Sequence, residues 1–483
     1  MNTPDAVVVG AGPNGLAAAV TLARAGLAVR VVEAADRIGG GTRTEELIEP
    51  GHVHDVCSAV HPMALASPFF RSFELPRRVR FAVPEISYAH PLDGGRAGLA
   101  WHDGAATAEG LGEDGGAYTR LFSPLVREID AVTGFVTGPV IGVPEDPASA
   151  FVFGRRVLGQ GSFLRRVRFA GATAPAMLAG VMAHAIQPLP SLSAAATGMV
   201  LGAMAHAGGW PIPLGGSHAI TDALAEDLLA HGGEIVTGHP VERLEELRPA
   251  RAVLLDVAAP MLRALAPGLL PARYLRALGR FRFGNAVCKV DFILSGAVPW
   301  ANADIGRAGT VHLGGTAAEI ADAEDDVARG RHPRKPYVLV SQPSIFDPGR
   351  APAGRQILWA YCHVPAGSTK DMTGEVTAQL ERFAPGFRDL VVASRATTAA
   401  GVAGYNPNYV GGDISAGAVD LRQLIARPVL SAAPWRTPLP GVYLCSASTP
   451  PGPGVHGMAG FHAARLALRD VFGLAVPPLG VGA

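Results

Sequence analysis

The chain has 483 residues, which corresponds to about three average domains or one large composite unit. Hydrophobic residues make up 48% of it and charged residues 17%, so there is enough apolar material for a sizeable core. Basic and acidic residues both number 41, and this balance argues against nucleic acid as a partner. We therefore expect a globular protein of several units that binds something other than nucleic acid.

The four cysteines, Cys57, Cys288, Cys362 and Cys445, are far apart and form no CxxC pair. This spacing argues against a zinc site, a disulfide framework and a dithiol redox centre. The first residues lack the basic segment of a signal peptide, and no run of 18 apolar residues occurs anywhere. We expect a cytoplasmic protein without a metal site.

The first segment with a clear chemical meaning is DAVVVGAGPNGLAAAVTLARAGLAVRVVEA, residues 5–34. A β-branched run predicts a buried parallel strand, and it leads into Gly10, Gly12 and Gly15 in G-x-G-x-x-G spacing, with Pro13 and Asn14 between the last two. An Ala-rich helix and a second strand ending at Glu33 follow. In this order the glycines admit a pyrophosphate at the helix N-terminus, and the acid accepts hydrogen bonds from a ribose. The segment predicts dinucleotide binding.

The residues after Glu33 indicate which dinucleotide is bound. Glu33, Arg37, Gly39 and Gly40 form E-x-x-x-R-x-G-G, a second glycine turn that an extended FAD needs and NAD does not. With this motif the segment resembles the flavoprotein amine oxidase and phytoene desaturase superfamily, which binds FAD. Gly41 stands where the amine oxidases usually have Arg, and Arg43 and Thr44 follow. The resemblance implies that FAD also contacts Ala34, Gly41 and Thr42.

The C-terminal part supports the same resemblance. GVYLCSASTPPGPGVHGMAGF, residues 441–461, predicts a buried strand, a rigid turn and the start of an apolar helix. In the superfamily this helix faces the pyrimidine end of the flavin, where negative charge develops on reduction. The resemblance assigns to flavin contact Ser446, Gly454, Val455, His456, Gly457 and Met458, and it places Val241 beside the adenine. Residues 54–62 and 406–415 are similar to a phytoene-dehydrogenase-like subgroup.

The predicted fold class is α/β, with a Rossmann-type FAD-binding domain and a discontinuous α+β substrate domain. We assign residues 1–65, 213–290 and 400–475 to the first and 66–212 and 291–399 to the second. In the second domain, residues 336–346 and 356–364 are expected to pair as antiparallel strands. Residues 155–207 are expected to be helical.

Two residues are candidates for catalysis. By resemblance Lys289 holds a water near flavin N5, with Asp291 on the same strand face; a lysine that snorkels from a strand edge is the alternative. His456, in the turn that faces the flavin, is either a hydrogen-bond partner of flavin or substrate or a structural turn residue. His54, Asp55, His61, Tyr405 and Tyr409 are further candidates for the pocket, with polar pairing or packing as the alternative.

These patterns favour an FAD-dependent oxidoreductase of the phytoene-desaturase-like branch. It would dehydrogenate a C–C or C–N bond of an apolar organic substrate by hydride transfer to flavin N5. The alternatives are an amine or amino-acid oxidase and a flavoprotein with an isomerase or interaction role. The sequence leaves open whether the electron acceptor is oxygen, a quinone or another carrier. It also leaves the oligomeric state open.

A basic segment adds a further alternative. Arg155, Arg156, Arg165, Arg166 and Arg168 lie among apolar residues and predict a solvated or partner-facing edge. Peripheral contact with an anionic membrane surface is the alternative.

Overall fold

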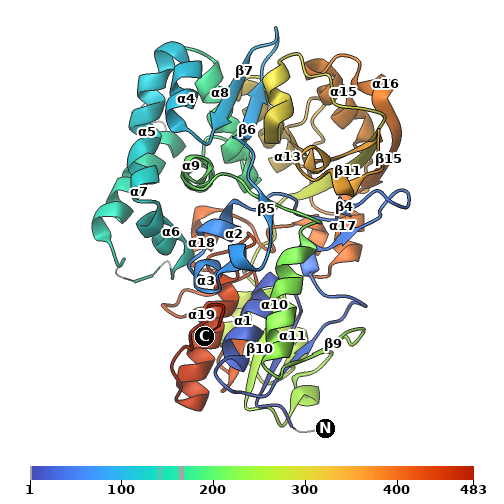
Figure 1. Ribbon diagram of the computed structural model, residues 1–483. Helices are drawn as coiled ribbons and strands as arrows, with labels where there is room; N and C mark the ends of the chain where they lie inside the picture. The colour runs from blue at the N-terminus through green and yellow to red at the C-terminus, as the bar shows by residue number, and fades with distance from the viewer. Residues whose placement is uncertain (1–2, 140, 143, 163–167, 483) are drawn as a thin grey trace.

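A five-stranded parallel sheet forms the lower part of the molecule (Figure 1). The computed structural model describes residues 3–139, 141–142, 144–162 and 168–482. The strand order is β16-β10-β1-β2-β9, and every neighbouring pair is parallel. The strands are β1 (Ala6–Val9), β2 (Val29–Val32), β9 (Glu234–Val236), β10 (Ala252–Leu255) and β16 (Val442–Leu444).

Helices cover both faces of this sheet, as the apolar runs of its central strands require. One face packs against α1 (Pro13–Ala23), α10 (His218–Ala230) and α19 (Met458–Ala467). The other packs against α11 (Leu262–Leu265) and α12 (Ala272–Leu278). Three distant parts of the chain thus build one Rossmann-type unit, and the predicted α/β class is confirmed.

A seven-stranded mixed sheet forms the second unit, in the order β15-β11-β14-β13-β12-β6-β7. Only β12 and β6 pair in parallel. The strands are β6 (Ile86–Pro91), β7 (Ala97–Trp101), β11 (Ala286–Leu294), β12 (Ala308–Leu313), β13 (Val338–Ser341), β14 (Gln356–Val364) and β15 (Val391–Thr397). The expected antiparallel pair is β13 and β14. The domain boundary placed at residue 290 falls inside β11, which belongs to this sheet along its whole length.

The two faces of the seven-stranded sheet differ in character. Alternate residues of β11, such as Cys288 and Val290, pack with α15 (Thr373–Phe383) in an apolar core. The opposite face carries Lys289 and Asp291, which are paired in register with Tyr361 and Trp359 of β14. This second face is turned toward the cavity described below.

A helical layer covers the remaining side of the cavity. It consists of α5 (Gly115–Arg127), α6 (Ile129–Thr137), α7 (Pro147–Gly161), α8 (Thr173–Met182) and α9 (Leu192–Ala207). Figure 1 shows these helices beside the seven-stranded sheet and above the parallel sheet. The other α-helices are α2 (Pro62–Ala66), α3 (Pro68–Ser72), α4 (Gly104–Gly110), α13 (Ala317–Ala328), α14 (Pro343–Phe346), α16 (Phe387–Leu390), α17 (Ala399–Tyr405) and α18 (Leu421–Ile425). Two short antiparallel strand pairs complete the fold: β3 (Thr44–Glu45) with β4 (His54–Asp55), and β5 (Phe81–Ala82) with β8 (Ile212–Pro213).

The basic segment begins on α7. Arg156 donates from Nε to the carbonyl oxygen of Leu121 on α5 (2.8 Å) and from Nη1 to that of Val152 on its own helix (3.0 Å), so its guanidinium is committed to these two helices. Arg165 and Arg166 lie outside the described residues. Within the part of the chain that the structure describes, no helix combines the length and the apolar character needed to cross a bilayer.

The crossing of α1 and α19 is the tightest contact in the parallel-sheet unit. A Cβ atom on Gly460 of α19 would lie 1.8 Å from the carbonyl oxygen of Asn14. Only glycine therefore allows the two helices to approach so closely at this point.

We predict that Gly460→Ala lowers the free energy of unfolding by about 1–3 kcal/mol, because overpacking forces the helices apart. Gly374→Ala is the matched control, since a Cβ at this helical position meets nothing within 4 Å. That variant should be unchanged or stabilised by up to about 1 kcal/mol. Chemical denaturation of both variants measures the difference; equal stabilities would contradict the close packing.

Candidate functional site: a dinucleotide cleft that opens into an apolar chamber

One cavity of about 760 Å³ runs between the two sheets and is lined by residues of both. At one end are Val9, Glu33, Asp256 and Ser446, each at or just beyond the carboxyl end of a parallel strand. Ligands of open α/β sheets bind at this edge, because the loops there diverge and the following helices begin. The large cavity is therefore the candidate site.

Close backbone and side-chain contacts require glycine at three positions of the first glycine turn. Cβ atoms on Gly10 and Gly12 would lie 2.9 Å from the carbonyl oxygen and from Oδ2 of Asp256, respectively. A Cβ on Gly15 would lie 2.0 Å from the carbonyl oxygen of Gly10, which forces glycine where helix meets strand. Helix α1 begins after Gly12 with no side-chain cap. A helix N-terminus that is approached through glycine fits a pyrophosphate.

Glu33 fixes the shape of this turn. Its Oε2 accepts a hydrogen bond from the N–H of Ala11 (2.8 Å), and its Oε1 accepts one from the N–H of Ala35 (2.9 Å). Arg43 lies close by, with Nη2 3.3 Å from Oε1. The carboxylate joins the first strand–helix turn to the second and still lines the cavity, where a ribose would lie.

The second glycine turn packs directly on the first. The N–H of Gly39 donates to the carbonyl oxygen of Ala11 (2.9 Å), and a Cβ on Gly40 would lie 3.2 Å from Cα of Gly12. A Cβ on Gly41 would lie 2.1 Å from the hydroxyl of Tyr409. The turn thus brings backbone from both glycine motifs to one wall of the cavity.

The predicted cofactor contact of Arg37 is not supported. Its side chain is 56% exposed, lies near Asp36 and Glu45, and does not line the cavity. Arg43 lines the cavity instead, with its guanidinium over the ring of Tyr405 at 5.3 Å. A cofactor contact of Arg37 stays a prediction, and Arg43 is the one of these two arginines whose side chain lines the cavity.

Asp256 is a cavity residue that the sequence analysis did not identify. It directly follows β10, and its Oδ2 accepts a hydrogen bond from the N–H of Gly15 at 2.9 Å. Burial in the cavity wall raises the pKa of this carboxyl to about 7; the Gly15 N–H opposes the rise and the nearby Glu33 adds to it. A titrating acid therefore lies at the N-terminus of α1, beside the phosphate position.

The C-terminal turn forms the opposite wall. Gly454, Val455 and His456 line the cavity, and Gly457 begins α19 with a φ of 67° that favours glycine. His456 is buried: its Nδ1 accepts from the N–H of Met458 (3.0 Å), and its Nε2 lies 3.1 Å from the carbonyl oxygen of Gly452. Burial lowers the pKa of His456 to about 4. Both ring nitrogens serve the turn, so this geometry favours the structural alternative over a catalytic His456.

Most of the predicted cofactor residues meet at the large cavity. The residues that line it are Gly10, Gly12, Pro13, Asn14, Glu33, Ala34, Gly40, Gly41, Thr42, Val241, Ser446, Gly454, Val455 and His456. Those that do not are Gly15, Arg37, Gly39, Gly457 and Met458. Apart from Arg37, this second group shapes the turns or helix starts that carry the lining.

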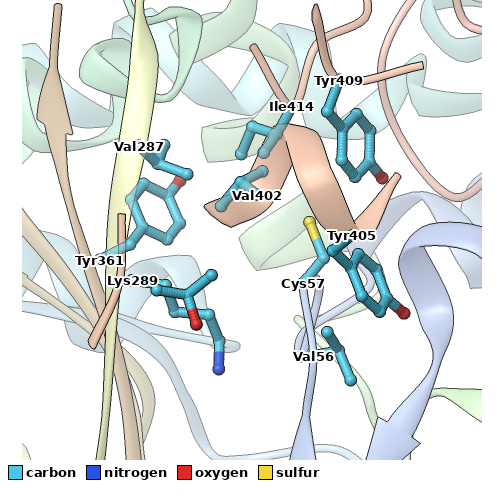
Figure 2. Close-up of a pocket in the computed structure, with 10 residues that line it drawn as sticks. Val56, Cys57, Val287, Lys289, Tyr361, Val402, Tyr405, Tyr409 and Ile414 are labelled. Carbon is cyan, nitrogen blue, oxygen red and sulfur yellow. The ribbon is translucent and has the colours of Figure 1, made fainter. Parts of the chain in front are cut away.

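Lys289 lies behind the cavity wall. It lines a separate space of about 30 Å³, together with Cys57, Tyr361, Tyr405 and Tyr409, which also line the large cavity (Figure 2). Its Nζ pairs with Asp291, whose Oδ1 lies 3.2 Å from Nδ1 of His54. Lys289 and Asp291 share a strand face as expected, and a catalytic role of Lys289 stays a prediction.

Asp55 and His61 are engaged in joining the two units. The carboxylate of Asp55 is paired with the buried Arg350 (2.5 Å) and accepts from the N–H of Ser217 (2.8 Å). His61 Nε2 lies 2.7 Å from the hydroxyl of Ser217. Both groups form polar pairs, which was the alternative for them; His61 also lines the large cavity, whereas Asp55 does not.

The residues present fit FAD. The glycine turns leave the space of missing side chains, and Oδ1 of Asn14 is buried beside them without a partner among the described residues. Glycine is the N-cap residue of both α1 and α19, and residues just before each helix line this cavity. A second glycine turn and a long cavity suit a dinucleotide that continues past its pyrophosphate.

Comparisons with known proteins agree with this geometry. Residues 8–73 match the NAD(P)-binding Rossmann-like domain family. The chain is 26% identical over 560 residues to the rat pyridine nucleotide-disulfide oxidoreductase domain-containing protein 2, covering 97% of this chain and 94% of the relative. It is 28% identical to an uncharacterized protein of Mycobacterium tuberculosis, with 77% of each chain covered.

Solved structures of oxidases have a similar fold. A putrescine oxidase with putrescine bound has a TM-score of 0.60 at 19% identity, covering 98% of this chain and 99% of the other. Cyclohexylamine oxidase from Brevibacterium oxydans has a TM-score of 0.58 at 16% identity, covering 98% of each chain. Together, the matched domain, the fold and the cavity define a Rossmann-type dinucleotide-binding protein with an amine-oxidase-like fold. FAD is the cofactor that the two glycine turns predict and that the cavity fits.

We predict that Asp256→Asn stabilises the protein without added cofactor more at pH 8 than at pH 5. The pKa of the folded carboxyl is about 7, above its ordinary value of 3.8, so the folded state retains a proton that the unfolded chain has released. The wild type therefore loses stability as the pH rises from about 4 to about 7.

Thermal unfolding at both pH values measures the effect as the difference between variant and wild type. Asp389→Asn, on an exposed side chain, is the control and should show no such growth with pH. If the stability difference between Asp256→Asn and the wild type is the same at both pH values, the buried carboxyl does not titrate in this range and the prediction is wrong.

Proposed function

We propose that the protein is an FAD-dependent oxidoreductase of the phytoene-desaturase-like branch. It dehydrogenates a C–C or C–N bond of an apolar organic substrate. One observation supports this above the others: the dinucleotide cleft is continuous with an apolar chamber inside the second unit. A substrate in that chamber would meet the cofactor without crossing water.

The bound flavin would accept a hydride from a substrate carbon at N5, and this is the chemistry that it supplies. The chain's own residues bind, orient and keep the site dry. The glycine turns and Glu33 hold the dinucleotide, and the turn of His456 positions the start of α19 beside the flavin ring. Helices α6, α7 and α9 supply Phe135, Phe153 and Val200 to the chamber, which exclude water.

An amine oxidase is the second candidate, and a spatial arrangement favours it. Trp359, Tyr361, Tyr405 and Tyr409 all line the large cavity, although the chain has only 8 Tyr and 5 Trp. An aromatic wall beside a flavin suits an amine, and the two solved neighbours named above are amine oxidases. The third alternative, a flavin without net redox turnover, is kept as an outcome of the test.

The test is anaerobic reduction of the purified, FAD-loaded protein. We expect absorption bands near ~370 and ~450 nm that bleach when an apolar substrate such as a hydrophobic ketone or alcohol is added. A hydrophobic amine in parallel distinguishes the second candidate. Admission of air then separates an oxidase, which reoxidises fast, from a dehydrogenase with another acceptor.

A flavin that dithionite reduces but that no organic compound reduces would contradict both proposals and favour a non-redox role. A protein that cannot be loaded with FAD would contradict the cofactor itself. Bleaching by the amine alone would replace the first proposal with the second.

A further inference from the structure

The large cavity carries all of its formal charge at one end. Among the described residues that line it, the acidic and basic side chains other than histidine are Glu33, Arg43 and Asp256, all beside the glycine turns. Lys289 is behind the wall and is paired with Asp291. The remaining chamber therefore has no acidic or basic counter-ion in its described lining.

The histidines of the chamber are neutral. Burial lowers the pKa of His61 to about 4 and that of His184 to about 3, where the neighbouring His363 adds to the effect. Both imidazoles are uncharged at neutral pH. A charged substrate group in the chamber would lose its hydration without gaining an opposite charge, which is costly.

Among the neutral polar groups that line the chamber, His184 and Tyr361 each keep a hydrogen-bonding atom that has no partner among the described residues. His184, in the turn after α8, uses Nε2 to contact Nε2 of the buried His312 at 2.9 Å, and its Nδ1 has no partner among the described residues. This Nδ1 atom is not fully buried, so it is open to the cavity. The hydroxyl of Tyr361 is likewise open and has no hydrogen bond among the described residues.

The sheet register relates Tyr361 to His312, the partner of His184. His312, Leu339 and Tyr361 are neighbours across β12, β13 and β14 on one face of the sheet; Leu339 and Tyr361 line the cavity, and His312 is buried behind His184. Adjacent strands lie about 4.8 Å apart, which puts the backbones of His312 and Tyr361 about 10 Å from each other. Figure 2 shows the Tyr361 ring beside Val287 and Lys289, opposite Val402. The apolar Leu339 separates the two polar groups.

Much of the rest of the chamber is apolar, although Ser193, Thr197, Thr310 and Trp359 also line the cavity. The helical layer and the segment near α18 provide side chains that offer no hydrogen bond: Phe135, Val136, Phe153, Val200, Leu201, Val419, Leu421, Leu424 and Ile425. This wall extends outward to Leu421 and Ile425, which are 48% and 41% exposed. The body of a bound molecule would therefore lie against hydrocarbon.

We propose that the chamber selects an uncharged substrate with an apolar body and a neutral oxygen-bearing group that hydrogen-bonds to Tyr361 and His184. This inference rests on the proposed function and specifies its substrate class. Tyr361 and His184 are assigned here as specificity residues; His312 positions the His184 ring by holding its Nε2. Carboxylates and ammonium groups are excluded by the missing counter-ion.

The test compares three probes of equal chain length on the FAD-loaded protein at pH 7.5: 2-decanone, decylammonium and decanoate. Calorimetry measures their binding without any turnover. We expect 2-decanone to bind at least about tenfold more tightly than either ion, because only the ions lose solvation uncompensated. An ion that binds as tightly as the ketone would overturn the inference.

Variants test the two specificity residues directly. Tyr361→Phe and His184→Phe should each weaken the binding of 2-decanone about fivefold, because each variant loses one hydrogen bond to it. The weak binding of decylammonium should be unchanged. Tyr274→Phe is the matched control, because its hydroxyl is also unpartnered but lies on α12, outside the cavity. Variants that bind 2-decanone like the wild type would overturn the roles of Tyr361 and His184.

The binding readout keeps this inference distinct from the proposed function. If FAD binds but no probe reduces it, the proposed function fails, while the order of probe affinities still supports or overturns the charge rule. If the flavin is reduced by a hydrophobic amine and decylammonium binds best, the inference fails and the amine oxidase proposal stands.

Discussion

The contact between α1 and α19 at Gly460 and Asn14 determines where the site can be. Two helices cross with almost no side-chain separation, and each begins at the large cavity. Their N-termini therefore face the same space from opposite ends of the chain. Helix α1 follows the glycine turn that fits a pyrophosphate, and α19 follows the turn that His456 holds. Because both starts are anchored by one crossing, a dinucleotide held at α1 has its far end directed toward α19.

This arrangement divides the cavity into a charged end and a neutral end. Glu33, Arg43 and Asp256 surround the dinucleotide cleft, where phosphates and riboses bring their own charge and polarity. The chamber beyond it is bounded by the sheet face of Tyr361 and by the helical layer. Hydride transfer from carbon to a flavin needs no water, and a dry chamber keeps water away from the reacting atoms. The electrostatics and the proposed chemistry are therefore consistent.

The local parts of the site could be predicted from the sequence, and the non-local parts could not. The glycine turns, the flanking strands and the C-terminal turn are continuous segments whose geometry follows from glycine, proline and β-branched residues. Asp256 meets Gly15 across 241 residues, and His184 meets His312 across 128, so no short pattern signals either contact. The aromatic wall is assembled from β14, from the end of α17 and from the segment after it, which a count of Tyr and Trp cannot reveal. Only the folded turn shows that Arg43 lines the cavity and that Arg37 does not.

The most direct test of the account is to identify what the protein holds after purification. Acid denaturation followed by chromatography and mass spectrometry of the released material measures both the identity and the amount of the nucleotide. The account predicts FAD at close to one molecule per chain, bound tightly enough to survive gel filtration after reconstitution. Release of NAD(P) or FMN, or failure to retain FAD at all, would contradict a cleft built for a resident FAD.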